Sequence, residues 1–333
     1  MSDRSRSSGF RPAWWLPGPH AQTLWGKLAR RVPRVPLAVE RWDTPDGDVL
    51  ELHRLAAGPD VDSPPHVLVL HGLEGTVRSH YARGLLAEAQ RRGWSADLLL
   101  WRSCGSEPNR TRRFYHSGET GDLALVVDRL LAETPGRRLG IAGVSLGGNV
   151  LLKYLGERGT DVPPEVVAAV AVSVPLDLAA GADRVGRGFS RVYQRYFISS
   201  LRHKALEKQR RFPDIGDPER IARVCTLREF DDLVTAPVHG FASAEDYYSR
   251  SSSIAFLAGI RVPTLLLNAM DDPFLTPGVL ERTRIAAAAN PALTVEFPTG
   301  GGHAGFVGGA NPLRPEYYLE RRVAEFLAGP FGK

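Results

Sequence analysis

The sequence predicts an α/β fold, with one doubly wound and mostly parallel sheet that a helical segment interrupts. Apolar, strand-like runs alternate with amphipathic helical segments over residues 66–175, and such alternation is typical of a parallel sheet covered by helices on both faces. The alternation stops at about residue 176 and resumes with "VPTLLLNAMDDP" (262–273). We therefore predict three parts: an N-terminal arm (1–36), a core (37–175 and 256–333) and a helical cap (176–255).

Local patterns justify the elements of the first half in order. Two strand-like segments, 37–43 and 49–55, flank the turn signal Pro45-Asp46-Gly47, which predicts a hairpin. The run "HVLVLHG" (66–72) is continuously apolar and ends in glycine, as a buried parallel strand does. The same criteria predict helices over 79–92, 119–136 and 145–159, and strands over 94–101, 138–144 and 165–175.

The second half begins with the insertion. Residues 176–255 are polar, rich in arginine and aromatic residues, and free of strand-like runs, so we expect helices that cover a pocket. Beyond it, the strand-like run 262–273 rejoins the sheet. A helix (277–289), a strand (292–297) and a closing helix (315–328) then complete the predicted core.

Composition limits the class of protein. The 333 residues are 43% hydrophobic and 24% charged, which is ordinary for a soluble globular protein. The formal net charge of +5 is carried by short arginine clusters, which we interpret mainly as a solvated surface. Two cysteines, Cys104 and Cys225, cannot form a disulfide framework or a paired-cysteine metal site.

The N-terminal region bears on location. "MSDRSRSSGF" lacks the apolar stretch of a secretory signal, and no run has the length of a membrane span, so we expect a cytoplasmic protein. Trp14, Trp15 and Trp25 lie near arginines in the arm, which leaves peripheral membrane contact open as an alternative to packing on the core. The oligomeric state stays open too.

A short motif supplies a candidate nucleophile. Gly143-Val144-Ser145-Leu146-Gly147 matches G-x-S-x-G, and it falls where a predicted strand gives way to a predicted helix. In that context a strained turn exposes the serine, and a Cβ at either glycine would crowd the neighbouring backbone. A serine hydroxyl is a weak nucleophile at neutral pH, so Ser145 requires a base and a group that orients the base.

Later loops supply both groups in the chain order that this architecture uses, serine, acid and histidine. His303 lies in the glycine-rich loop "PTGGGHAGF" after the last predicted strand. Asp272 lies at the C-terminal end of the strand-like run 262–273 and precedes Pro273, so we choose it as the acid. Asp271 is the second candidate, and Asp177, after the preceding strand, is the third.

A carbonyl group that is attacked by serine develops negative charge on its oxygen, which backbone N–H groups can stabilise. We expect these donors at Leu146, directly after Ser145, and at Leu73, in the loop after "LVLHG". The other conspicuous histidines, His71, His116 and His239, are expected to have structural roles.

Motifs for other chemistry are missing from the sequence. There is no H-E-x-x-H, no P-loop and no G-x-G-x-x-G after the first strands. We therefore expect no metal, no cofactor and no nucleic-acid partner.

Taken together, several strings resemble one family over nearly the whole chain from about residue 10. The strings are "HGLEGTVRSHYARGL", "EPNRTRRFYHSGETGDL", "GVSLGGNVLLKYLGE", "REFDDLVTAPVHGFASAEDYY", "NAMDDPF" and "GGHAGFVGG". They are similar to the YheT-like branch of the α/β-hydrolases, which is related to the ABHD-type lipid hydrolases. The resemblance implies an α/β-hydrolase fold with a cap, and a charge relay of Ser145, Asp272 and His303.

The resulting hypothesis is a serine hydrolase that cleaves carboxylic esters, either short-chain or fatty-acyl, through an acyl-enzyme. Its partner would be a small-molecule or lipid ester. Two alternatives use the same fold: an acyltransferase with the same three residues, and a non-catalytic protein that binds a lipid or a partner in the pocket.

Overall fold

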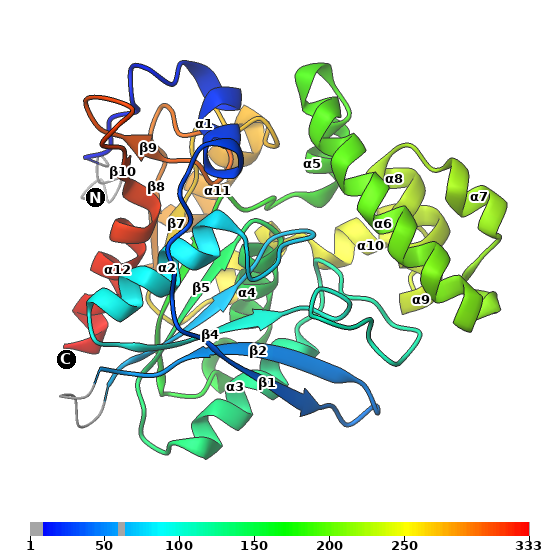
Figure 1. Cartoon of the computed structure of the whole chain (residues 1–333), viewed down its shortest axis with the longest axis horizontal. Helices are drawn as coiled ribbons and strands as arrows, with labels where there is room; N and C mark the ends of the chain where they lie inside the picture. Colours follow the sequence, from blue (N-terminus) through cyan, green and yellow to red (C-terminus); the bar gives the residue numbers. More distant parts are fainter. Residues whose placement is uncertain (1–8, 59–63, 333) are drawn as a thin grey trace.

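A single large sheet forms the centre of the computed structural model, which describes residues 9–58 and 64–332 (Figure 1). Its eight strands lie in the order β1-β2-β4-β3-β5-β6-β7-β8. The pairs β1–β2 and β2–β4 are antiparallel, and all other neighbours are parallel. The strands are β1 (Ala38–Asp43), β2 (Val49–Leu55), β3 (His66–Leu70), β4 (Ser95–Leu100), β5 (Leu139–Val144), β6 (Val166–Val172), β7 (Thr264–Leu267) and β8 (Leu293–Glu296). The predicted α/β fold with a mostly parallel sheet is confirmed.

Helices cover both faces of this sheet (Figure 1). Side chains of α2 (His80–Arg91) and α12 (Tyr318–Phe331) join the apolar cluster on one face. Side chains of α3 (Gly121–Glu133), α4 (Leu146–Arg158) and α11 (Pro277–Ala288) join the cluster on the other. This is the doubly wound arrangement that alternating strands and helices predict.

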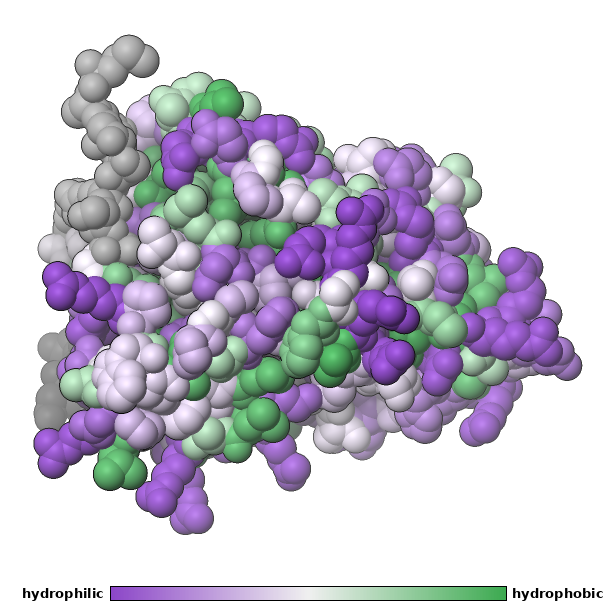
Figure 2. Space-filling model, turned by 90° about the horizontal axis from the view of Figure 1, so that it is seen from above, coloured by the Kyte–Doolittle hydropathy of each residue, from purple (hydrophilic) through white to green (hydrophobic). Residues whose placement is uncertain are grey.

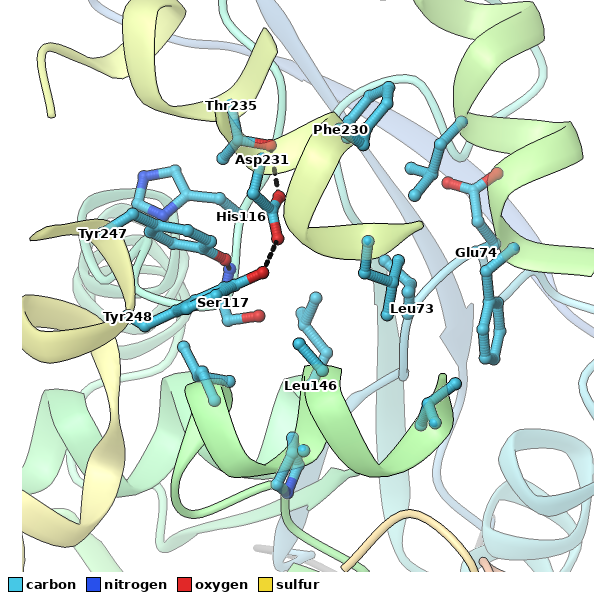
Figure 3. Close-up of a pocket in the computed structure, with 18 of the residues that line it drawn as sticks. Leu73, Glu74, His116, Ser117, Leu146, Phe230, Asp231, Thr235, Tyr247 and Tyr248 are labelled. Atoms are coloured by element: carbon cyan, nitrogen blue, oxygen red, sulfur yellow. Dashed lines mark hydrogen bonds between the residues drawn. The ribbon is translucent and has the colours of Figure 1, made fainter. Parts of the chain in front are cut away.

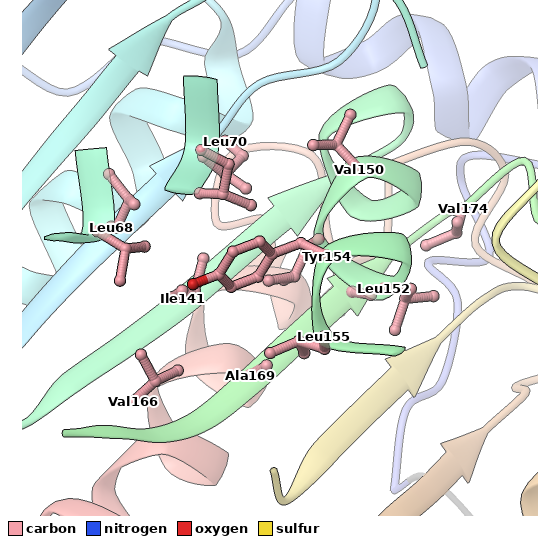
Figure 4. Close-up of a cluster of buried hydrophobic side chains, with 14 of the residues drawn as sticks. Leu68, Leu70, Ile141, Val150, Leu152, Tyr154, Leu155, Val166, Ala169 and Val174 are labelled. Carbon is pink, nitrogen blue, oxygen red and sulfur yellow. The ribbon is translucent and has the colours of Figure 1, made fainter. Parts of the chain in front are cut away.

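The buried strands explain the continuous apolar runs. In β3, Leu68 and Leu70 belong to the cluster with α3 and α4, whereas Val67 and Val69 belong to the cluster with α2 and α12. Successive side chains of a strand point to opposite faces, so a strand covered on both sides is apolar throughout. Figure 4 shows Leu68 and Leu70 beside Tyr154 of α4, a fully buried aromatic side chain.

Helices fill the chain between β6 and β7, where the sequence predicts the helical insertion. They are α5 (Leu178–Val185), α6 (Arg191–Arg211), α7 (Pro218–Arg223), α8 (Leu227–Phe230), α9 (Ala236–His239) and α10 (Ala244–Ser251), with a π-helical turn at Asp231–Thr235 and 3-10 turns at Gly188–Ser190, Pro213–Ile215 and Ser253–Gly259. We call α5–α10 the cap. The cap has its own buried apolar cluster, which Phe114 joins from the core.

The N-terminal arm contains a helix that the sequence analysis does not anticipate, α1 (Gly18–Leu28). Trp25 of α1 packs against Trp15, with ring centroids 4.8 Å apart, while Trp14 is exposed. A two-stranded sheet of β9 (Val307–Gly308) and β10 (Glu316–Tyr317) lies beside the arm. In the described part of the chain, no helix is long and apolar enough to cross a membrane.

Several element ends differ from the prediction, and two of the differences have a clear cause. The strand expected over 262–273 ends at Leu267, because the chain turns at residues 268–273 towards α11. The closing helix begins at Tyr318 rather than at 315, because residues 316 and 317 pair with β9.

Seen from above, hydrophilic residues cover most of the surface, with apolar residues scattered between them (Figure 2).

Candidate active site

Ser145 lies in a sharp turn between β5 and α4. Its backbone has φ 55° and ψ −121°, a region that side-chain-bearing residues rarely occupy and that often marks functional sites. The Ser145 N–H donates a hydrogen bond to the Val172 carbonyl at 2.8 Å, which fixes the turn on the neighbouring strand. The serine side chain remains partly exposed beside the end of the sheet.

The two glycines of the motif are required by close backbone contacts. A Cβ at Gly143 would lie 2.5 Å from the Gly147 carbonyl oxygen, and a Cβ at Gly147 would lie 2.5 Å from the Leu70 carbonyl oxygen. Both atoms belong to the backbone and cannot rotate away. This geometry agrees with the reason given for the glycines from sequence.

We expect Gly147→Ala to lower the free energy of unfolding by about 2–3 kcal/mol, because the new methyl group overpacks a rigid backbone contact. Urea denaturation measures the loss. Gly278→Ala is the matched control, since a Cβ there meets nothing within 4 Å and alanine favours the helix. Equal effects of the two substitutions would contradict the steric explanation.

The imidazole of His303 lies between Ser145 and Asp272. Its Nε2 is 3.0 Å from Ser145 Oγ, and its Nδ1 is 2.9 Å from Asp272 Oδ2 and 3.2 Å from Oδ1. The Asp272 carboxylate is buried and also accepts a hydrogen bond from the Phe274 N–H at 2.9 Å. The Phe274 ring stacks on His303 with centroids 4.1 Å apart. The three residues chosen from sequence thus form one hydrogen-bonded chain.

The other two acid candidates have different partners. The Asp271 carboxylate accepts a hydrogen bond from the Gly302 N–H at 2.9 Å, and burial raises the pKa of this carboxyl. Asp177 caps α5 through the Ala180 N–H and pairs with Arg282. Neither carboxylate is bonded to His303, so the structure favours Asp272 as its partner.

The remaining histidines lie outside this chain of hydrogen bonds. His71 is fully buried, hydrogen-bonded to the Gly72 carbonyl at 2.7 Å and to the Trp101 N–H at 3.2 Å, and burial lowers its pKa to about 4. The rings of His116 and His239 pack together with centroids 4.4 Å apart. These contacts fit the structural roles expected for them.

The loop after β3 lies directly against the serine. A Cβ at Gly72 would be 2.9 Å from Ser145 Cβ, and both Leu73 and Leu146 line the cavity into which Ser145 opens. Within residues 9–58 and 64–332, neither the Leu73 amide nor the Leu146 amide has a hydrogen-bond acceptor. Both N–H groups are therefore free to bind a substrate oxygen.

That cavity has a volume of about 1040 Å³, including its open mouth. Core and cap both contribute walls, and most wall residues are apolar. The apolar members include Leu73, Phe114, Leu146, Leu178, Val185, Phe197, Leu201, Leu227, Phe230 and Phe274. Figure 3 shows Asp231, Thr235, His116, Ser117, Tyr247 and Tyr248 gathered on one side, across the space from Leu73, Leu146 and the charged Glu74.

A charged pair joins the predicted oxyanion loop to the cap. The Glu74 carboxylate accepts hydrogen bonds from Lys204 Nζ of α6 at 2.9 Å, from the Tyr115 hydroxyl at 2.7 Å and from the Ser200 hydroxyl. The Glu74 N–H donates to the Tyr115 hydroxyl at 2.8 Å, and its backbone has φ 55°. These contacts hold the residue next to Leu73, and the sequence analysis did not identify them.

Helix α1 supports the histidine loop, which the sequence analysis also missed. The His303 N–H donates to Thr23 Oγ1 at 2.9 Å. Gln22 exchanges hydrogen bonds with Val307, from Nε2 to the carbonyl at 3.0 Å and from the Val307 N–H to Oε1 at 2.8 Å. No local pattern could reveal contacts between segments some 280 residues apart.

Thr23→Val is expected to lower kcat about tenfold. The isosteric valine leaves the His303 N–H without its acceptor, so the loop holds the His303 ring less firmly in position. Steady-state kinetics on a soluble ester measures the effect. Thr160→Val, at a distant surface turn, is the control. An unchanged kcat in Thr23→Val would show that α1 does not position the histidine.

Candidate metal ligands are not clustered. In the described ranges, no group of three or more His, Cys, Asp or Glu side chains is arranged to hold a metal ion.

Comparisons with known proteins identify the family of the chain. The chain matches the family described as the alpha/beta hydrolase fold over residues 65–310. It is 39% identical over 326 residues to the Escherichia coli (strain K12) protein YheT, which is named as a candidate esterase, across 97% of this chain and 94% of that protein. Phospholipase ABHD3 of Mus musculus is 29% identical over 96% of this chain and 78% of its own length.

Two more distant similarities extend the comparison. The monoacylglycerol lipase of Saccharomyces cerevisiae is 31% identical over 74% of this chain and 55% of that protein. Among solved structures, the esterase Pf2001 of Pyrococcus furiosus superposes with a TM-score of 0.55 at 17% identity, covering 89% of this chain and 91% of that chain. The structural likeness concerns the fold.

Proposed function

Because this chain belongs to the alpha/beta hydrolase fold family, in the branch of YheT, we propose that it hydrolyses carboxylic esters through Ser145, His303 and Asp272. The family resemblance that the motif strings indicate is confirmed. Relatives named as an esterase, a phospholipase and a lipase identify the chain as a carboxylic-ester hydrolase. The observation that carries the mechanism is the hydrogen-bonded chain from Ser145 Oγ through the imidazole to Asp272, at 3.0 and 2.9 Å.

The proposed reaction follows from these contacts. Ser145 Oγ attacks the ester carbonyl while His303 Nε2 accepts its proton, and the protonated ring then donates that proton to the leaving alkoxide. Asp272 holds Nδ1–H and stabilises the imidazolium ion. Water, deprotonated by His303, attacks the acyl-enzyme and releases the acid.

Negative charge on the carbonyl oxygen must be stabilised during both attacks. We assign this role to the amides of Leu73 and Leu146, which line the cavity beside Ser145. A donor of this kind contributes about 3 kcal/mol in the transition state. The Glu74–Lys204 contact supports the assignment, because it fixes the chain next to Leu73.

The walls of the cavity favour an ester with an apolar portion. Aliphatic and aromatic side chains of the cap and the core dominate the lining, which suits an acyl chain. Two relatives are named as a phospholipase and a monoacylglycerol lipase, which supports fatty-acyl esters as the substrate class. We propose hydrolysis rather than acyl transfer, since the relatives compared above carry esterase and lipase names.

A fluorophosphonate probe tests the nucleophile without knowledge of the substrate. We expect one phosphonyl adduct per chain, on the peptide that contains Ser145, together with hydrolysis of a series of p-nitrophenyl esters of increasing acyl length. An adduct on a different residue, or full labelling of Ser145→Ala, would exclude the proposed mechanism. The acyl length with the highest kcat/KM would separate short-chain from fatty-acyl hydrolysis.

A further inference from the structure

One side of the cavity departs from its apolar character. Asp231, on the π-helical turn between α8 and α9, is partly buried and lines the cavity. Its Oδ1 accepts a hydrogen bond from the Thr235 hydroxyl at 2.6 Å, and its Oδ2 accepts one from the Tyr248 hydroxyl at 2.7 Å. Burial raises the pKa of this carboxyl to about 6. A π-helical turn is rare and frequently marks a functional site.

The carboxylate has no cationic partner of its own. In the part of the chain that the structure describes, no lysine, arginine or histidine nitrogen lies within 4.0 Å of Asp231. The cationic group whose charge acts on Asp231 is the guanidinium of Arg228. This guanidinium pairs with Asp183 and Glu245, and it lies 5.2 Å from the Tyr248 ring centroid. Each carboxylate oxygen accepts one hydroxyl hydrogen and retains a second lone pair.

Hydroxyl groups lie on the same side of the cavity (Figure 3). The Tyr247 hydroxyl accepts a hydrogen bond from the Ser117 N–H at 2.9 Å, and the Ser117 side chain lies beside the same phenol oxygen. Two hydroxyls in contact use one hydrogen between them and can offer the other to a ligand. The side therefore combines an acceptor, Asp231, with one hydroxyl donor from the Ser117–Tyr247 pair.

We propose that this polar side of the cavity is a subsite for a hydroxyl group of the substrate, with Asp231 as its acceptor. A hydroxyl donates and accepts at once, which matches a carboxylate acceptor beside one hydroxyl donor, whereas an ammonium group could not use that donor. The apolar walls would hold the rest of the ester. This inference rests on the proposed function, since it assigns a substrate class to the same cavity.

Paired esters that differ in one or two hydroxyls test the subsite and show which half of the substrate carries the hydroxyl. Glycerol monohexanoate is compared with propyl hexanoate for the alcohol half, and ethyl hydroxyhexanoate with ethyl hexanoate for the acyl half. We expect the full-length protein to prefer the hydroxylated member of one pair by about tenfold or more in kcat/KM.

Two variants assign that preference to the subsite. Asp231→Asn, which keeps the shape of the side chain, and Ser117→Ala, which removes one small hydroxyl, are each expected to lower the preference about tenfold. Asp232→Asn is the matched control: this neighbouring carboxylate accepts a hydrogen bond from the Ala244 N–H and does not line the cavity, so the preference should stay. Circular dichroism checks folding, and Ser117→Ala decides the question if Asp231→Asn does not fold.

The outcomes separate this inference from the proposed function. If the protein is labelled at Ser145 and hydrolyses all four esters without preference, the subsite is excluded and the hydrolase mechanism stands. A preference that survives both variants also excludes the subsite. If the protein neither hydrolyses these esters nor reacts with the fluorophosphonate, the proposed function fails, and the subsite fails with it.

Discussion

Replacing Ser145 by alanine is expected to lower kcat for ester hydrolysis by about 10,000-fold to a million-fold. The substitution removes the oxygen that attacks the carbonyl and leaves His303 with no proton to accept. Alanine keeps the Cβ, so the turn at φ 55° and the contact from the Ser145 N–H to Val172 remain possible. The loss should therefore appear in kcat, with the free energy of unfolding changed by less than about 1 kcal/mol.

Steady-state kinetics on p-nitrophenyl butyrate, with urea denaturation of the same preparations, measures both quantities. Ser249→Ala is the matched control, because Ser249 is exposed on α10 and bonds only the Asp246 carbonyl. Retention of a tenth or more of the activity in Ser145→Ala would remove this residue from the mechanism. A large loss of stability would instead make the activity loss uninformative, and Ser145→Cys would then be needed to separate the two effects.

Much of the sheet could be predicted because each buried strand carries its own signal. A strand covered on both faces is apolar along most of its length, as β5 is throughout and β3 is after His66, and short glycine-containing turns separate it from the next helix. Helix α1 had no such signal. It begins at Gly18 after Pro17, lacks a side-chain cap, and is stabilised by contacts with the chain near His303 and Val307. Propensity and periodicity cannot report contacts of that range.

The residues of the site also differ in whether the local sequence identifies them. Ser145, Asp272 and His303 each lie in a recognisable local setting: paired glycines, an Asp-Pro step and a glycine-rich loop. The contacts that support them depend on which segments meet in three dimensions. Glu74 with Lys204 and Asp231 with Tyr248 are isolated polar residues in the sequence, and their burial and pairing emerge only from the packing of the cap on the core.

Substitution of Asp272, which we choose as the acid over its neighbour Asp271, is the second change with a large expected effect on kcat. Asp272→Asn should lower kcat about 10,000-fold, because the asparagine amide can donate to Nδ1 and thereby favours the ring tautomer that carries its hydrogen on Nε2. That tautomer cannot accept the Ser145 proton. The contacts of 2.9 and 3.2 Å between His303 Nδ1 and the Asp272 carboxylate are the ones that the substitution alters.

Asp271→Asn is the matched control, with the same chemical change one residue away. Its side-chain oxygen can still accept the Gly302 N–H, so we expect kcat to fall less than tenfold. Burial raises the pKa of the Asp271 carboxyl, which means that the folded state disfavours its ionised form; a neutral asparagine should therefore not lower the free energy of unfolding at neutral pH. Kinetics and denaturation of both variants at pH 7 decide the matter. A larger loss of kcat in Asp271→Asn than in Asp272→Asn would reassign the acid to Asp271, and it would require the His303 ring to leave the position that places its Nε2 3.0 Å from Ser145.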